Sequence, residues 1–222
     1  REIKALEDDE VLSMLDAVSK GIGLTPHERV YWEKTKKRDK TILILFLTYG
    51  LRLSELQQLN ISSFNFTREE FKIYRKRGKE STMPLNKSVT KVIIDYINNE
   101  RRTDDVLEPS HKDALFLSLQ GKRMTQRQIR DLVKKYTSIA LKTSRSAGYS
   151  PHKLRATAAT SLIGRGNSIY DVAALLDHEQ VTTTQLYAKH RANVKRNLVS
   201  GMEWEEERLD VNSKEAQKES ED

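Results

Sequence analysis

The 222-residue chain contains no cysteine, which excludes disulfide bonds and thiolate chemistry and fits a reducing interior. Long hydrophobic runs are missing too, because none approaches the roughly 18–20 apolar residues of a transmembrane helix. Hydrophobic residues make up 37% of the chain, which is enough for one core. The opening stretch REIKALEDDE holds neither an initiator methionine nor a signal peptide. We therefore expect a piece of a longer cytoplasmic protein that makes no membrane contact.

Several catalytic motifs are also absent. The chain holds no GxxxxGK[ST] phosphate loop, no HExxH, no GxSxG and no Cys/His spacing for a metal. No cluster of acidic residues with metal-binding spacing stands out either. If this chain acts on phosphates, it must do so with side chains, and we expect neither a metal nor another cofactor.

Charge is distributed unevenly along the chain. The formal net charge is +7, but residues 201–222 hold nine acidic and three basic residues, so the rest carries +13. Such an excess favours a polyanion such as nucleic acid as partner, although lysine and arginine also simply solvate exposed helix faces. The acidic end has few apolar residues, and we expect disorder beyond Glu207.

Apolar periodicity and capping signals predict a mostly helical α+β protein. Capping residues begin helices at Thr25, Asn86, Thr125, Ser150 and Ser168. A short helix is expected in LRLSELQQLN, and Thr182 or Thr183 caps a last one that bears Tyr187. Residues 64–66, 71–75 and 81–85 alternate or carry β-branched and aromatic residues, with turn signals between them. They predict a small three-stranded antiparallel sheet.

Three residues near helix ends are candidates for binding an anion. Arg52 lies at the turn between two helices, in TYGLRLSEL, where its guanidinium can point outward. His152 and Arg155 are three residues apart at the start of a helix, so they share a face beside its positive end. Each of the three could instead be an ordinary solvated or capping-region residue.

A basic hairpin and a tyrosine complete the candidates. Lys76 lies in IYRKRGKESTMPL with Arg75, Arg77 and Lys79 around it. Such a hairpin can follow a phosphate backbone, or it can be a charged solvent loop, and local spacing alone does not single out Lys76. Tyr187, in LLDHEQVTTTQLYAKH, has an ordinary pKa of about 10 and is a poor nucleophile without cations and a base. Taken alone, it is a packed aromatic residue.

The order of these signals is more informative than any one of them. GLRLSEL, a hairpin lysine 24 residues on, SPHKLRATAAT and LLDHEQVTTTQLYAKH resemble the catalytic domain of the tyrosine recombinases. That family includes the Xer recombinases and the phage and transposon integrases. The resemblance runs from about residue 6 to about residue 190. Its six catalytic positions are filled by Arg52, Lys76, His152, Arg155, His178 and Tyr187.

The resemblance implies a site-specific DNA recombinase that cleaves and rejoins strands through a 3′-phosphotyrosyl intermediate, without metal or ATP. The two arginines would clamp the non-bridging oxygens of one phosphodiester, and Tyr187 would attack its phosphorus. Lys76 would protonate the leaving 5′ oxygen, His152 would assist proton transfer at the phenol, and His178 would hydrogen-bond the phosphate.

Partners and domains follow from the same resemblance. The chain would bind double-stranded DNA as a tetramer on two sites, associate weakly or not at all without DNA, and lie in the cytoplasm with the nucleoid. Residues 1–190 would form the catalytic domain, while the family's N-terminal core-binding domain is missing from this chain. Residues 191–222 would form a docking helix, in trans or in cis, and then the acidic tail. Its apolar stripe is Val194, Leu198 and Met202.

Further DNA contacts are expected from the basic hairpin and from the first turns of the helix that Thr125 caps. These residues are Arg75, Arg77, Lys79, Gln126, Arg127 and Arg130. One position departs from the family pattern, because Asp177 precedes His178 where glycine is usual. The backbone there must manage without easy access to a positive φ, and a carboxylate lies near the site.

Two other functions are compatible with parts of this pattern. A type IB topoisomerase shares the chemistry but relaxes supercoils without site choice, and it resembles the GLR-SEL and LLDH motifs less. A catalytically silent DNA-binding module would have no need for six intact catalytic positions. The sequence identifies neither the target DNA site nor the choice between mobile-element integration and excision and chromosome-dimer resolution.

Overall fold

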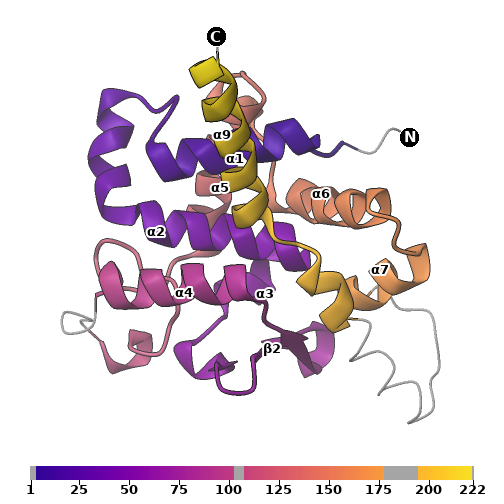
Figure 1. Cartoon of the computed structure of the whole chain (residues 1–222). Coiled ribbons are helices and arrows are strands. Elements are labelled where there is room, and N and C mark those ends of the chain that lie inside the picture. The colour runs from indigo at the N-terminus through magenta and orange to yellow at the C-terminus, as the bar shows by residue number, and fades with distance from the viewer. Residues whose placement is uncertain (1–3, 103–107, 178–194, 222) are drawn as a thin grey trace.

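Helices make up most of the computed structural model, which describes residues 4–102, 108–177 and 195–221 (Figure 1). The helices are α1 Asp8–Lys20, α2 Pro26–Tyr49, α3 Leu53–Gln57, α4 Lys87–Asn99, α5 Gln126–Ala140, α6 Pro151–Gly164, α7 Ile169–Leu176 and α9 Trp204–Glu221. Strands β1 Phe64–Asn65, β2 Glu70–Tyr74 and β3 Glu80–Pro84 pair antiparallel in the order β1-β2-β3. The predicted helical fold with a small three-stranded sheet is confirmed, with strand ends moved by one residue.

Capping interactions begin several helices where the sequence predicts them. At the start of α2, Thr25 Oγ1 accepts from the backbone N–H of Glu28 at 3.2 Å, and Glu28 Oε1 accepts from that of Thr25 at 2.9 Å. Thr125 begins α5 with the same reciprocal pattern. Helix α2 ends at Gly50, whose left-handed backbone (φ 59°) lets its N–H reach the carbonyl of Phe46. These local signals fix the helix boundaries that later position the site.

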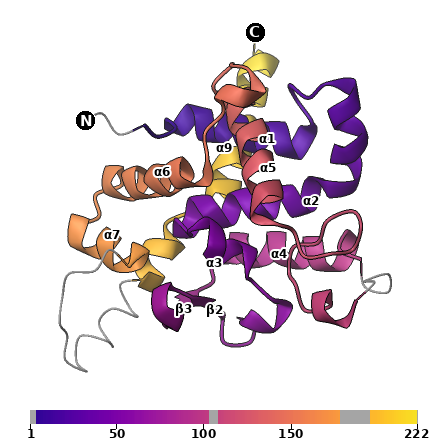
Figure 2. The same cartoon turned by 180° about the vertical axis from the view of Figure 1, so that it is seen from behind.

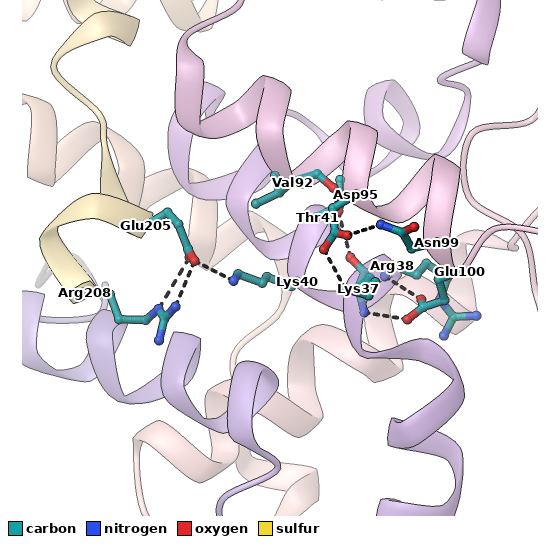
Figure 3. A network of polar contacts seen from close by, with 10 residues as sticks. All are labelled: Lys37, Arg38, Lys40, Thr41, Val92, Asp95, Asn99, Glu100, Glu205 and Arg208. Atoms are coloured by element: carbon teal, nitrogen blue, oxygen red, sulfur yellow. Dashed lines mark hydrogen bonds and ion pairs between the residues drawn. The ribbon is translucent and has the colours of Figure 1, made fainter. Parts of the chain in front are cut away.

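Helix α2 begins at one edge of the molecule, bends, and then runs through its middle (Figure 1). Its second half is buried on all sides from Thr41 to Tyr49, and α1, α4 and α6 pack around it. Near the bend, the carboxylate of Glu100 accepts the backbone N–H groups of Lys37 and Arg38 at 2.9 and 2.8 Å (Figure 3). A side chain that takes backbone donors in mid-helix is a recognised cause of such a bend. Among the described helices, none is long and apolar enough to cross a membrane.

The sheet covers the end of α2 and carries the basic hairpin. Phe71 and Ile73 of β2 face the core, with Phe71 opposite Met83 of β3. The ring of Phe71 meets Tyr49 of α2 edge-on, with centroids 4.9 Å apart. Both views place the sheet beyond α3, on the side of α2 away from α1 (Figures 1 and 2). The turn between β2 and β3 is thereby held near the ends of α2 and α3.

The C-terminal part of the chain docks onto the same core. Leu198, Met202 and Trp204 are buried, and α9 contacts α1 and α4. Glu205 accepts hydrogen bonds from Lys40 at 2.7 Å and from Arg208 at 2.8 Å (Figure 3). The expected disorder beyond Glu207 is therefore wrong for the described residues, because α9 remains helical to Glu221.

In this single chain the C-terminal segment packs against the chain's own body. Asn86 donates its side-chain amide to the carbonyl of Val199 at 2.8 Å, so the C-terminal segment touches the N-cap of α4 as well. Of the predicted apolar stripe, Leu198 and Met202 lie against this core, and Val194 lies outside the described residues. Composition predicted a solvated tail because acidic residues dominate it, whereas Trp204 and Arg208 anchor its first turns.

Candidate active site

Arg52 lies where α2 gives way to α3. It is the N-cap of α3, and its backbone N–H donates to Glu55 Oε1 at 2.7 Å. Its guanidinium is 3.5 Å from Glu55 Oε2 and its side chain is 29% exposed. The buried carboxylate of Glu55 thus fixes the backbone of Arg52 and leaves part of the guanidinium open to a ligand.

Glu55 is a site residue that the sequence reasoning missed. Its side chain is 2% exposed and lies between the guanidinium groups of Arg52 and Arg75. The spacing was a usable signal, because a glutamate three residues after an N-cap is the position that bonds back to the cap.

Arg155 ties together the ends of three helices. From the first turns of the buried face of α6, it donates to the carbonyl of Gly50 and to that of Leu176, each at 2.6 Å. Burial, and next the nearby Arg52 cation, lower the pKa of Arg155 to about 10. A cation crowded by other cations in a buried place is stabilised when an anion arrives.

Three predicted catalytic residues meet at one cavity of about 440 Å³, the arginine cavity. It is lined by Leu51, Arg52, Leu53, Arg130, Ser150, Pro151, His152 and Arg155. The N-terminal end of α6 opens on this space, and its partial positive charge favours a bound anion. The structure therefore brings Arg52, His152 and Arg155 together and adds Arg130, which the sequence placed in a DNA-contacting helix without linking it to them.

Lys76 is not among the residues that line this cavity. It begins a single turn of 3-10 helix, Lys76–Gly78, between β2 and β3, and its side chain is exposed. Arg77 in the same turn has a left-handed backbone with φ 62° and is also exposed. The side chain of Lys79 is 50% exposed, with its Nζ 3.3 Å from Asp177 Oδ1. The turn therefore exposes the side chains of Lys76, Arg77 and Lys79 to solvent.

Arg75 lies differently from the outward DNA contact that the sequence suggested. Its side chain is 1% exposed, and its Nη2 donates to the carbonyl of Leu175 at 2.9 Å. Its Nε is 3.8 Å from Glu55 Oε2, and its Nη1 is 3.8 Å from Asp177 Oδ2. A guanidinium buried in this way cannot reach a DNA backbone, so the prediction of Arg75 as a DNA contact is wrong.

The other expected DNA contacts on α5 are exposed at its first turns. Gln126, Arg127 and Arg130 all face solvent, while Ile129 turns into the core. Because Arg130 also lines the arginine cavity, this end of α5 is continuous with the candidate site.

Asp177 shows how the departure from glycine is accommodated. It is the residue after α7, and its backbone is left-handed, with φ 57° and ψ 40°. Aspartate tolerates this conformation better than most residues, so the helix ends as it would with glycine. His178 and Tyr187, the remaining catalytic candidates, lie outside the described residues.

Comparisons with known proteins identify the family of the chain. The model of the family described as "Phage integrase family" matches residues 4–193, a range that contains all six catalytic candidates. The chain is 35% identical over 150 residues to the tyrosine recombinase XerD of Staphylococcus haemolyticus, covering 68% of this chain and 49% of that protein. It is 33% identical over 161 residues to the tyrosine recombinase XerC of Chlamydia trachomatis, covering 72% and 49%. The chain thus spans about half the length of these relatives.

A solved structure shares the fold. The site-specific recombinase XerH, bound to its difH substrate in a pre-cleavage complex, matches with a TM-score of 0.63 and 20% identity. The match covers 86% of this chain and 55% of that one. At this identity the likeness establishes the fold alone.

Proposed function

Because the chain belongs to the phage integrase family, whose relatives here are tyrosine recombinases, we propose that it cleaves and rejoins DNA at specific sites through a covalent phosphotyrosyl intermediate. The observation that carries the proposal is the arginine cavity. Two guanidinium groups from α3 and α6 and a histidine at a helix N-terminus converge on a space that suits one phosphodiester.

The proposed chemistry uses five of the six catalytic candidates as follows. Arg52 and Arg155 bind the two non-bridging oxygens and neutralise the charge that grows on them in the transition state. Tyr187 loses its proton with help from His152, its oxygen attacks phosphorus, and the bond from phosphorus to the 5′ oxygen breaks. Lys76 gives its proton to that oxygen. A 5′-hydroxyl of another strand reverses the step, so the phosphodiester energy is conserved and no ATP is needed.

DNA would approach the exposed cations around the cavity. Arg77 and Lys79 on the hairpin and Gln126, Arg127 and Arg130 on α5 form our proposed contact surface, and all five side chains are exposed to solvent. The four cations suit the phosphate backbone, which supplies most non-specific affinity, and the amide of Gln126 can hydrogen-bond to it.

Assembly into a tetramer on two DNA sites is part of the same proposal. It rests on the family and on the chemistry, since strand exchange needs a second cleaved strand to supply the incoming 5′-hydroxyl. Deleting residues 191–222 would be a poor test of assembly, because it would expose the core around Trp204 and Met202. Sedimentation of the intact chain with and without DNA that carries two sites is cleaner, and a 1:1 complex at saturation would contradict the tetramer.

The test of the proposed chemistry is a covalent adduct. The probe is a library of nicked DNA duplexes with randomised arms, in which cleavage next to the nick releases a short fragment and traps the enzyme. We expect a protein–DNA band that survives denaturation for the wild type and for Tyr170→Phe, whose side chain is 86% exposed and serves as the matched control. Tyr187→Phe should form none.

The other outcomes identify the rival functions. An adduct that persists in Tyr187→Phe would assign the nucleophile elsewhere. DNA binding without an adduct in any variant would leave a DNA-binding module. Relaxation of supercoiled plasmids without preference among the library sequences would indicate a type IB topoisomerase.

A further inference from the structure

Asp177 connects the basic hairpin to the end of α7. Its Oδ2 lies 3.8 Å from Arg75 Nη1, and its Oδ1 lies 3.3 Å from Lys79 Nζ. The two cations stand on either side of the turn that holds Lys76. One carboxylate therefore pairs with a cation at each end of the loop that carries Lys76, the proposed general acid.

Arg75 is the buried one of the two cations that pair with Asp177. Its Nη2 is bonded to the carbonyl of Leu175, at the negative end of α7, while its Nε and Nη1 have no hydrogen-bond partner among the described residues. The carboxylates of Glu55 and Asp177 approach these two nitrogens at 3.8 Å each. Its position thus depends on charge at a distance as well as on one hydrogen bond, and loss of either carboxylate would leave a buried cation poorly compensated.

Backbone hydrogen bonds connect the positions of Arg75 and Lys79 to that of Lys76. Arg75 directly precedes Lys76, and its N–H donates to the carbonyl of Lys79 at 2.7 Å, closing the turn. The N–H of Lys79 in turn donates to the carbonyl of Lys76 at 3.4 Å. Fixing the Arg75 and Lys79 side chains therefore fixes the path of the residues between them.

The same end of α7 also binds Arg155, which lines the arginine cavity. Arg155 donates to the carbonyl of Leu176, one residue along from the carbonyl that Arg75 uses. The hairpin and the cavity thus share one anchor, the three residues Leu175, Leu176 and Asp177. Movement of the hairpin away from this anchor would separate the lysine from a phosphate held by Arg155.

We propose that Asp177 and Arg75 are positioning residues for Lys76: they hold its loop against the end of α7, which also binds Arg155, so that Lys76 can protonate the leaving 5′ oxygen. This inference rests on the proposed function. Where glycine is usual in the family, Asp177 adds a carboxylate that pairs with Arg75 and Lys79. Asp177 therefore contributes to the step in which Lys76 protonates the leaving 5′ oxygen.

The test compares two leaving groups on one DNA sequence, taken from the library selection that traps the wild type. One duplex has the ordinary 5′ oxygen at the scissile bond, and the other has sulfur in its place. A thiol has a pKa of about 8.5, so a sulfur leaving group departs as the thiolate without a proton from the enzyme. A defect that acts through the general acid disappears on the sulfur substrate, whereas a general loss of structure or DNA affinity does not.

Asp177→Asn keeps the shape of the side chain and removes its charge. We expect it to slow adduct formation about 10–100-fold on the oxygen substrate and about threefold or less on the sulfur substrate, as for a partial loss of general-acid catalysis. Lys76→Ala should show the same pattern with a larger oxygen defect. Asp171→Asn, in the first turn of the same helix, is the matched control and should react like the wild type on both.

Lys79→Gln provides a second reading at an exposed position, where folding is not at stake. It should slow the oxygen substrate more than the sulfur substrate, and any loss of DNA affinity cancels in the ratio of the two rates. Equal slowing of both substrates by Asp177→Asn and Lys79→Gln, or no slowing by either, would overturn the inference. Lack of rescue of Lys76→Ala by sulfur would overturn it too. A wild type that forms no adduct with either duplex refutes the proposed function itself.

Discussion

Gly50 is a single residue on which the ends of three helices depend. Its left-handed backbone (φ 59°) ends α2, and its carbonyl accepts a hydrogen bond from Arg155 of α6. A Cβ added there would overlap the side chain of Leu176 at the end of α7 and approach Arg155 Cγ at 3.7 Å. The position has room for neither a side chain nor a change of backbone.

Gly50→Ala should therefore weaken both the fold and the site. We expect the free energy of unfolding to fall by about 1–2 kcal/mol, from the strained φ and the displaced Leu176, with a larger relative loss of adduct formation. Urea denaturation and the trapping assay measure the two effects. Gly164→Ala is the control, because nothing lies within 4 Å of its added Cβ and it sits in a helix. Equal stability of the two variants would contradict this view of Gly50.

Glu28 makes a titratable contribution to stability far from the site. Hydrogen bonds from Arg145 are the main cause that lowers the pKa of Glu28 from 4.5 to about 2. A carboxyl group with a lowered pKa in the folded state stabilises the fold when it is ionised, above the pKa of the unfolded chain. That stabilisation is lost as the pH falls from about 4.5 towards 2.

Glu28→Gln should reproduce that loss at neutral pH, since glutamine retains the capping interaction with Thr25 but carries no charge. We expect about 1–2 kcal/mol less stability at pH 7, a figure reduced for the 39% exposure of Arg145. Denaturation curves of wild type and variant should converge between pH 4.5 and pH 2. A difference that stays constant over this range would show that the charge of Glu28 contributes nothing.

The docking of helix α9 depends in part on buried charge. Burial alone would raise the pKa of Glu205, but hydrogen bonds from Arg208 and Lys40 outweigh it and lower that pKa. Arg208 also lies 3.6 Å from Asp16 of α1, so one carboxylate in α9 helps join α1, α2 and α9.

Glu205→Ala should loosen α9 from the body. Two cations would be left without their shared partner in a largely buried place, and we expect a loss of about 3 kcal/mol in unfolding free energy. Limited proteolysis after residue 195 reports release of the helix directly. Glu206→Ala, the exposed neighbour, should behave as the wild type. Resistance of Glu205→Ala to the protease would show that the apolar contacts of Trp204 suffice.

The elements that local rules govern were predictable, and those that depend on distant partners were not. Capping boxes at Thr25 and Thr125 and the strand alternation placed α2, α5 and the sheet. The inward turn of Arg75 could not be seen among its basic neighbours, because its partners Leu175 and Asp177 lie about 100 residues away. The helical tail was missed for a similar reason, since Lys40 and the core supply what its composition lacks.

At the scale of the whole molecule, the separation of charge predicts which side of the chain would bind DNA. The C-terminal segment 201–222 carries −6 and the rest +13, so the docked α9 puts acidic residues against one part of a basic body. The arginine cavity, the hairpin and the first turns of α5 lie together around the start of α6 and the end of α7. DNA should therefore bind on the cavity side.

The salt dependence of binding to a random-sequence duplex checks this arrangement without knowledge of the target site. Replacing Arg77, Lys79 and Arg127 with glutamine should lower the slope of log affinity against log salt by about 0.9 for each phosphate that the variant no longer neutralises. The control has the same number of exposed lysines changed to glutamine on α4 and α9: Lys91, Lys214 and Lys218. Its slope should stay close to that of the wild type, because counterions are released from the phosphates that the protein neutralises, whatever its total charge. If both triple variants reduce the slope equally, net charge governs binding and the cavity side has no special role in it; if the first alone does, the cations around the cavity face the DNA.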